Sequence, residues 1–138
     1  MTSTHPTPVR ILIADDHELM RRGLRSILAT RSDWEVCGEA VDGSDAIEKT
    51  KLLRPDILVL DISMPRVNGL EVTRAIRRDF PATQVVILSQ YEESEMRPYA
   101  IEAGARGYVS KAEASRQLLT AIESLIGNQP QVANPQAH

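Results

Sequence analysis

Short runs of branched apolar residues recur along the chain, each bounded by polar or turn-forming residues. Residues 9–14, 57–60 and 85–88 are runs of this kind. Uninterrupted apolar runs of this length are typical of strands buried on both faces of a parallel sheet. Residues 34–41 interleave glutamates with apolar positions, which suits an edge strand, and residues 107–110 are a shorter candidate. The pattern therefore predicts a sheet of five strands.

Between these runs, apolar residues follow a helical period. Segments 20–28 and 118–126 both place them at positions i, i+4, i+7 and i+8, and Gly127 is placed to end the second helix. Further helices are predicted near residues 44–53, 68–79 and 93–103. The alternation of strands and helices predicts an α/β fold, in which right-handed crossovers put helices on both faces of the sheet.

The two ends of the chain carry no such periodicity. Residues 1–8 are polar and include two prolines, so we expect a flexible leader. Residues 128–138 are polar as well and are expected to form a flexible tail or the start of a linker. The remaining residues, 9–127, are predicted to fold as one domain, since single domains cluster near this size.

Composition narrows the classes of protein to consider. The 138 residues are 42% hydrophobic and 25% charged, as in a soluble globular domain that needs neither a disulfide nor a structural metal. Sixteen basic against nineteen acidic side chains give a net charge of −3, which argues against direct binding to nucleic acid. The single cysteine excludes a disulfide framework and a four-cysteine zinc site. Without a membrane-spanning stretch or a signal-peptide core, the chain is expected to be cytoplasmic and not to bind membranes.

Polar side chains follow the predicted strands at the point where each strand ends. They are Asp15 and Asp16, Asp61, Ser89, and Ser110 with Lys111. Ligands of open α/β sheets bind beyond the carboxyl ends of the strands, where the strand order reverses. If residues 34–41 form an edge strand, this point lies between the first and third strands. The three aspartates would then meet there.

Three neighbouring carboxylates need a compensating charge, because two unit charges 4 Å apart repel by about 4 kcal/mol at an effective dielectric constant of 20. Either one carboxyl group stays protonated or a divalent cation fills the site. Carboxylate oxygens suit Mg²⁺, with Mn²⁺ as the second choice. Together with the ammonium group of Lys111 and the hydroxyl group of Ser89, such a cation would make a receptacle for a phosphoryl group at Asp61.

Four segments carry a resemblance to a known family: ILIADDHE, DILVLDISMPRVNG, VVILSQY and GARGYVSK. They resemble the receiver domains of bacterial response regulators, the CheY-like family, over roughly residues 9–126. The finer match, in DDHELMRRGL and QLLTAIESLIGN, is to receivers of the NarL/FixJ group, which precede a LuxR-type DNA-binding domain. The resemblance implies a flavodoxin-like (βα)5 doubly wound parallel sheet with strand order 2-1-3-4-5.

The resemblance also implies a set of site residues. Asp61 would be the phosphoryl acceptor and would take the group from a phosphohistidine of a sensor histidine kinase. Asp16 would bind Mg²⁺ directly and Asp15 mainly through water. The remaining protein ligands would be Asp61 itself and the backbone carbonyl group of Ser63.

Further roles are implied beyond the metal ligands. Lys111 and Ser89 would bind phosphoryl oxygens, and Tyr108 would act as an aromatic rotamer switch. Pro65 and Gly69 would shape the loop after the acceptor, with the glycine supplying backbone freedom.

The resemblance implies a role for two further positions near Asp61, and the chain departs from the family pattern at a third position. Ser63 and Tyr91 would modulate access of the hydrolytic water. Ala112 follows Lys111, where many receivers have a proline in a cis peptide bond. A cis bond before any other residue costs about 3–4 kcal/mol, so both geometries of this bond stay open at this point.

Each candidate also has an ordinary structural interpretation. Asp15 and Asp16 could cap the helix that follows them, and Ser89 could cap the helix after its strand. Asp61 could be a strand-end turn residue, and Tyr108 a core residue. The coincidence of all these residues at one end of one sheet favours the functional interpretation.

Other conspicuous residues are assigned structural roles. His17 is expected to be a surface residue at the start of a helix and not a ligand, and Cys37 a small buried residue. Arg21, Arg22 and Arg25 are expected to form a solvated helix face.

The predicted function is a phosphorylation-controlled switch and not a turnover enzyme. Phosphorylation of Asp61 would draw Ser89 inward, let Tyr108 rotate toward the vacated space, and remodel the face built from residues 93–127. This face would also support a homodimer on phosphorylation. The output would be control of transcription through a DNA-binding domain absent from this chain. The alternative is a stand-alone receiver that acts by protein–protein interaction.

Three other classes fit the pattern less well. A dehalogenase-like phosphatase would carry a DxD motif after the first strand, where this chain has Asp15, Asp16 and His17. A flavin-binding protein of the same fold class would need a glycine- and hydroxyl-rich phosphate loop there, and the acidic sequence would repel that phosphate. An unphosphorylated interaction module would have lost some of the candidate residues.

Overall fold

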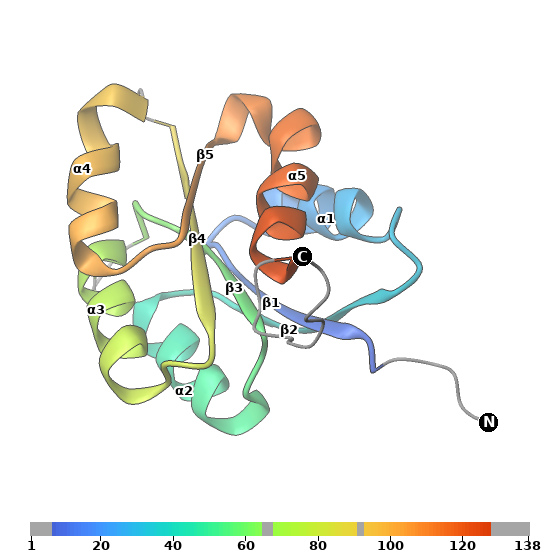
Figure 1. Ribbon diagram of the computed structural model, residues 1–138, viewed down its shortest axis with the longest axis horizontal. Helices are drawn as coiled ribbons and strands as arrows, with labels where there is room; N and C mark the ends of the chain where they lie inside the picture. Colours follow the sequence, from blue (N-terminus) through green and yellow to red (C-terminus); the bar gives the residue numbers. More distant parts are fainter. Residues whose placement is uncertain (1–6, 65–67, 91–92, 128–138) are drawn as a thin grey trace, which may run out of the picture.

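The computed structural model describes residues 7–64, 68–90 and 93–127, which form a five-stranded parallel sheet covered by helices (Figure 1). The strand order is β2-β1-β3-β4-β5, as predicted. The strands are β1 (Val9–Ala14), β2 (Trp34–Ala40), β3 (Ile57–Asp61), β4 (Gln84–Ser89) and β5 (Gly107–Ser110). The predicted strands are confirmed, with ends that differ by one residue in β2, β3 and β4.

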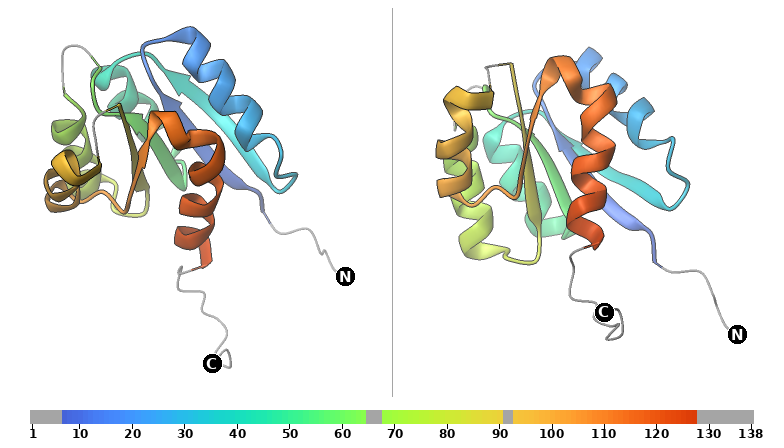
Figure 2. Two further views of the ribbon diagram at one scale, coloured as in Figure 1. Left: turned by 90° about the horizontal axis from the view of Figure 1, so that it is seen from above. Right: turned by 45° about the horizontal axis from the view of Figure 1, so that its top comes forward.

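The helices lie in two layers, one on each face of the sheet (Figure 2). They are α1 (Glu18–Leu28), α2 (Gly43–Leu53), α3 (Gly69–Asp79), α4 (Glu93–Ala103) and α5 (Ala114–Gly127), with a short 3-10 helix, η1 (Lys111–Glu113), before the last. Helices α1 and α5 cover one face, and α2, α3 and α4 cover the other. None of the helices in the described ranges combines the length and apolarity that a bilayer span requires.

Two separate apolar layers hold the helices to the sheet. On the α1 and α5 side, Leu24 and Leu118 pack with one set of alternating positions from β1, β3 and β4. On the other side, Ala46 of α2 and Ile76 of α3 pack with the other set. Because successive side chains of a strand point to opposite faces, a strand buried on both faces is apolar throughout. This burial explains the uninterrupted runs in the sequence.

The edge strand β2 contains a one-residue bulge. The register shifts between Ile11 and Leu12 of β1, and Cys37 of β2 has no opposite residue. A bulge inverts the alternation of side chains along the strand beyond it. Glu39 therefore pairs with Ile13 and lies on the face that α1 covers.

Cys37 itself differs from the prediction, because it is only half-buried and packs at the margin of the cluster on the α2 side. Its place in the bulge, on the edge strand, leaves part of the side chain accessible. Burial raises the pKa of its thiol above the usual value. The thiol is therefore expected to be neutral at physiological pH.

The loop between β3 and α3 depends on the absence of a side chain at Gly69. A Cβ atom at this position would lie 2.6 Å from Cα of Ile62, far inside van der Waals contact. Among the described glycines only Gly104 has a positive φ, so the expectation that Gly69 supplies backbone freedom is wrong. Its role is to let the first turn of α3 approach the residue that follows Asp61.

Some predictions fall on residues that the structure does not describe. Pro65 and Tyr91 lie outside the described residues, as does the predicted tail, 128–138. Of the predicted leader, 1–8, only Thr7 and Pro8 are described.

The close approach at Gly69 can be tested by substitution. Gly69→Ala should lower the free energy of unfolding by about 1–3 kcal/mol, because the backbone of Ile62 must move. The matched control is Gly23→Ala in α1, where a Cβ atom meets nothing within 4 Å. That variant should gain about 0.5–1 kcal/mol from helix propensity. Urea unfolding of both variants provides the measurement, and equal effects would contradict the account.

Candidate functional site

The candidate residues gather at the carboxyl ends of the strands. Asp15 follows β1, Asp61 is the last residue of β3, and Ser89 is the last residue of β4. Their relative exposures are 0%, 1% and 0%, so all three polar groups are inside the protein. Burying a polar side chain costs free energy, so several buried together are characteristic of a functional site.

Lys111 joins two of these buried residues. Its Nζ atom lies 3.2 Å from Oδ2 of Asp61 and 3.3 Å from Oδ2 of Asp15. The lysine follows β5, where the hydroxyl group of Ser110 accepts a hydrogen bond from the backbone N–H of Ala112 and begins η1. The described residues contain no cis peptide bond, so the Lys111–Ala112 bond is trans. The ammonium group reaches the carboxylates in this geometry.

Each buried aspartate also fixes the loop that follows it. Oδ1 of Asp15 accepts a hydrogen bond from the backbone N–H of His17 at 2.9 Å, and Oδ1 of Asp61 accepts one from Ser63 at 3.0 Å. The turn interpretation of Asp61 is thus correct and compatible with its place in the ion pair. The capping interpretation of the acidic pair is wrong, because the N-cap of α1 is His17, and it makes no side-chain capping bond.

Three carboxylates and one imidazole form a group that could hold a metal ion. One ligand atom each from Asp15, Asp16, His17 and Asp61 lies within 4.8 Å of all the others. Oδ2 of Asp15 is buried and faces Nζ of Lys111 at 3.3 Å, and the side chain of Asp16 is 29% exposed. The oxygen-rich donors, whose carboxylates outnumber the one ammonium group beside them, fit a hard divalent cation.

His17 lies at the surface where the sequence predicted it, at the start of α1 and 71% exposed. Its Nδ1 atom is 3.2 Å from Oδ1 of Asp16, which places it in the group of possible ligands. Sequence reasoning gave it no such role. The only signal available was its position next to the acidic pair.

The electrostatics of the site set the protonation behaviour of Asp61 and Lys111. Burial, followed by the charge of Asp15, raises the pKa of Asp61, although the N–H of Ser63 and the ammonium group of Lys111 oppose the shift. For Lys111, burial works to lower the pKa, but the carboxylates of Asp61 and Asp15 outweigh it and raise the pKa. The lysine therefore remains charged, and the site holds more negative than positive charge.

Tyr108 lies on β5, with β4 between it and the strand that carries Asp61, and its ring is inside the protein. It is 6% exposed and belongs to the cluster that also contains Ala100 and Ala105. Its hydroxyl group is buried and has no hydrogen-bond partner among the described residues. An unpaired buried hydroxyl group costs about 1–3 kcal/mol, so this position of the side chain is destabilised relative to a hydrated one.

The arginines of α1 differ from the predicted solvated face. Arg22 is 71% exposed, but Arg21 is only 14% exposed. The guanidinium groups of Arg21 and Arg25 both bind the carboxylate of Glu39, at 2.7 Å in each case. Sequence reasoning missed this contact because the bulge in β2 brings Glu39 to the face of α1.

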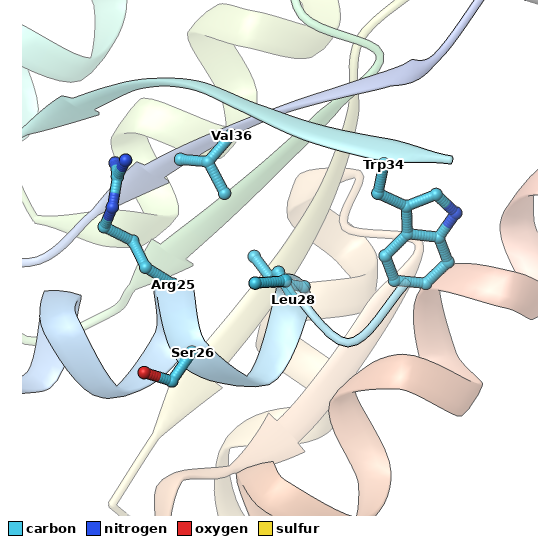
Figure 3. A pocket seen from close by; sticks show the side chains of 6 residues that line it. Arg25, Ser26, Leu28, Trp34 and Val36 are labelled. Atoms are coloured by element: carbon cyan, nitrogen blue, oxygen red, sulfur yellow. The ribbon is translucent and has the colours of Figure 1, made fainter. Parts of the chain in front are cut away.

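The hollow between α1 and β2 is separate from the acidic site (Figure 3). It has a volume of about 340 Å³ and is lined by Arg25, Ser26, Leu28, Ala29, Trp34 and Val36. It contains no carboxylate, and it is open on one side.

The fold and the site define the class of protein. A parallel sheet of order 2-1-3-4-5, with buried aspartates after β1 and β3 and a lysine after β5, is the architecture of a CheY-like receiver. Residues 11–123 match the response regulator receiver domain family. The chain belongs to this family.

Two curated relatives are response regulators. The chain is 36% identical over 122 residues to the response regulator VraR of Staphylococcus saprophyticus, and 36% identical over 126 residues to the response regulator UvrY of Escherichia coli K12. The matches cover 88% and 91% of this chain and 58% of each relative. The chain thus spans a little over half the length of these relatives.

Two solved structures are similar along their length. The receiver domain of the response regulator NarL of Mycobacterium tuberculosis superimposes with a TM-score of 0.83 at 31% identity, over 90% of this chain and 100% of that one. A LuxR-family response regulator of Aurantimonas sp. SI85-9A1 gives a TM-score of 0.82 at 35% identity, over 87% of this chain and 86% of that one. The protein is a receiver domain related to LuxR-family regulators.

The raised pKa of Asp61 predicts how stability depends on pH. The folded protein keeps a proton on Asp61 at pH values where the unfolded chain has lost it. The free energy of unfolding therefore falls as pH rises from the unfolded pKa, about 4, through the raised value. In EDTA, Asp61→Asn should abolish this fall and be about 0.5–2 kcal/mol more stable than the unsubstituted protein near pH 7.

The control for this prediction is Asp79→Asn. Asp79 is exposed at the end of α3 and pairs with Arg78, so its loss should change stability by less than about 0.5 kcal/mol. Urea unfolding across the pH range is the measurement. If Asp61→Asn were less stable than the unsubstituted protein at neutral pH, the raised pKa of Asp61 would be contradicted.

Proposed function

We propose that this receiver accepts a phosphoryl group on Asp61 from a phosphohistidine of a sensor histidine kinase, and that the reaction requires Mg²⁺. A single observation carries the proposal: the buried carboxylate of Asp61 points Oδ2 at the ammonium group of Lys111, 3.2 Å away. An oxygen of Asp61 attacks phosphorus, the P–N bond to the donor breaks, and the imidazole takes up a proton. Lys111 supplies a fixed positive charge beside the incoming phosphoryl oxygens.

The acidic residues would hold the cation. Asp16 and Asp61 would bind Mg²⁺ directly, Asp15 through water, and the backbone carbonyl group of Ser63 would complete the protein ligands. Mn²⁺ would fit the same oxygen donors. When bound, the cation would offset the negative charge of the carboxylates and the phosphoryl group. The close grouping of carboxylate oxygens, all within 4.8 Å of one another, supports a site of this kind.

Ser89 and Tyr108 would couple the acceptor to the surface. Ser89 is buried at the end of β4, where its hydroxyl group would donate to a phosphoryl oxygen. Tyr108 would change position when Ser89 moves. The buried position, in which the hydroxyl group is unpaired, would be one of the two positions that a switch requires. Phosphorylation need only bind one of the two states more tightly to shift their populations.

The output surface would be the face built by α4, β5 and α5. On α4, Tyr99 and Ile101 are 56% and 54% exposed, more than large apolar residues usually are. We propose that this face forms a homodimer or binds a partner when Asp61 is phosphorylated.

The relatives suggest what the output controls. DegU of Brevibacillus brevis, 35% identical over 115 residues, is a transcriptional regulatory protein, and RcsB, 26% identical, has been solved in complex with DNA. We propose that this receiver controls transcription through a DNA-binding segment distinct from the receiver domain. The alternative is a receiver that acts by protein–protein contacts alone. In either case it would act in the cytoplasm, where an ATP-dependent kinase would supply the phosphoryl group, and not at a membrane.

The experiment that tests this function is transfer from a small phosphodonor. With Mg²⁺ and phosphoramidate, intact mass should increase by one phosphoryl group, and EDTA should prevent the increase. Asp61→Asn should gain nothing, whereas the control Asp79→Asn should react as the unsubstituted protein does, because Asp79 is exposed and remote in the fold. A phosphoryl adduct on Asp61→Asn would overturn the proposal, as would the absence of any adduct with both phosphoramidate and a phosphorylated kinase.

Dimerisation has its own test. Beryllofluoride with Mg²⁺ should raise the sedimentation coefficient from that of a monomer to that of a dimer. Replacing Tyr99 and Ile101 by Ser should prevent the rise, while Leu52→Ser, at a 71% exposed apolar residue of α2, should leave it unchanged. An unchanged monomer with and without beryllofluoride would exclude the dimer.

A further inference from the structure

Arg21 makes a contact at the acidic site that none of the roles above uses. Its side chain is 14% exposed, and its guanidinium group donates from NH1 to the backbone carbonyl oxygen of Asp15 at 2.8 Å. From Nε it donates to Oε1 of Glu39 at 2.7 Å. A planar guanidinium group can serve two acceptors at once without reorienting. Arg21 therefore links residues 15–17, the acidic loop between β1 and α1, to strand β2.

The carbonyl group that Arg21 binds belongs to the peptide that leads into Asp16. Because a peptide group is planar, the orientation of the Asp15 carbonyl group also sets the direction of the Asp16 N–H and the approach to its Cα atom. The N–H of Asp15 is held as well, by the carbonyl oxygen of Ala40 at 3.0 Å. Both backbone polar groups of Asp15 are thus fastened to neighbouring elements.

Glu39 holds Arg21 in place, and the bulge at Cys37 brings Glu39 to the correct face. Its other carboxylate oxygen binds Arg25 at 2.7 Å, and its backbone carbonyl oxygen accepts from Nζ of Lys49 at 2.6 Å. Burial opposes the charge of Glu39, but the two guanidinium groups outweigh it and hold the pKa of Glu39 below its usual value. Glu39 therefore stays ionised and can anchor both arginines.

We propose that Arg21 is a positioning residue for the cation site: through the Asp15 carbonyl group it orients the peptide that carries Asp16. The inference rests on the proposed function, since it concerns the Mg²⁺ that the acidic residues would bind. Residues that orient metal ligands without touching the metal commonly contribute about 10- to 100-fold to affinity.

Arg25 is a matched control within the same cluster. It extends from α1 toward β2 and binds Glu39 at the same distance as Arg21 does, but no hydrogen bond joins it to the acidic loop among the described contacts (Figure 3). Replacing either arginine by Gln removes one positive charge. The two substitutions therefore have the same effect on net charge and differ in the contact with Asp15.

The direction of the change in Mg²⁺ affinity distinguishes a positioning role of Arg21 from a purely electrostatic one. If the arginines acted only as nearby positive charges, removing one would strengthen the binding of a cation. If Arg21 holds the acidic loop in its binding geometry, its removal weakens binding. Weaker binding by Arg21→Gln alone is therefore a result that the loss of charge does not produce.

The experiment measures the Mg²⁺ dissociation constant by isothermal titration calorimetry for the unsubstituted chain and for Arg21→Gln, Arg25→Gln and Asp16→Asn. We expect the constant to rise about tenfold for Arg21→Gln and to stay within about twofold, or fall, for Arg25→Gln. Urea unfolding in EDTA accompanies each titration. If Arg21→Gln does not fold, Arg21→Lys and Arg25→Lys replace the pair, because a lysine at position 21 has one nitrogen for two acceptors.

The outcomes distinguish this inference from the proposed function. Equal constants for the two arginine variants, or tighter binding by Arg21→Gln, would overturn the role of Arg21 and leave the metal site intact. If the unsubstituted chain bound no Mg²⁺, or bound it as well after Asp16→Asn, the cation site itself would be wrong, and the role of Arg21 with it.

Discussion

The buried pairing of Asp61 with Lys111 is the interaction on which this receiver depends. One ammonium group faces two carboxylates that are almost entirely withdrawn from solvent, with a third carboxylate beside them. The ammonium group keeps the aspartates buried, but one positive charge does not balance them. This imbalance favours a cation, which in the proposed function would offset the negative charge of the carboxylates and of an incoming phosphoryl group. A neutral or fully paired cluster would be more stable and would attract no cation.

The fold meets this requirement by bringing distant segments to one edge. The ends of four parallel strands converge there, and each strand is anchored on both faces by apolar contacts, so the polar residues that follow are held by rigid elements. Loop contacts then orient the carboxylates. Asp15 and Asp61 each accept a hydrogen bond through Oδ1 from the backbone N–H two residues later, and Oδ2 of each faces Lys111. Gly69 lets α3 approach closely the residue that follows Asp61.

Much of this arrangement could be predicted from the sequence, because it depends on local pattern and on the resemblance. The apolar runs predict the strands, and the positions just beyond or at the strand ends predict Asp15, Asp61 and Lys111 as site residues. The features that escaped prediction arise from contacts between elements. A bulge at Cys37 depends on how β2 pairs with β1, and it reverses the side on which Glu39 lies. Without that reversal Arg21 would lack its carboxylate partner, so its burial could not be inferred from α1 alone.

The central claim is that the Asp61 carboxylate receives a phosphoryl group between the cation ligands and Lys111. A crystal structure of the protein with beryllofluoride and Mg²⁺ tests it most directly. The account predicts one BeF₃ group bonded to an Asp61 carboxylate oxygen, in contact with Nζ of Lys111 and the hydroxyl group of Ser89, and one Mg²⁺ bound to Asp16. A BeF₃ group bonded elsewhere, or an Asp61 carboxylate left unmodified at saturating beryllofluoride, would contradict it.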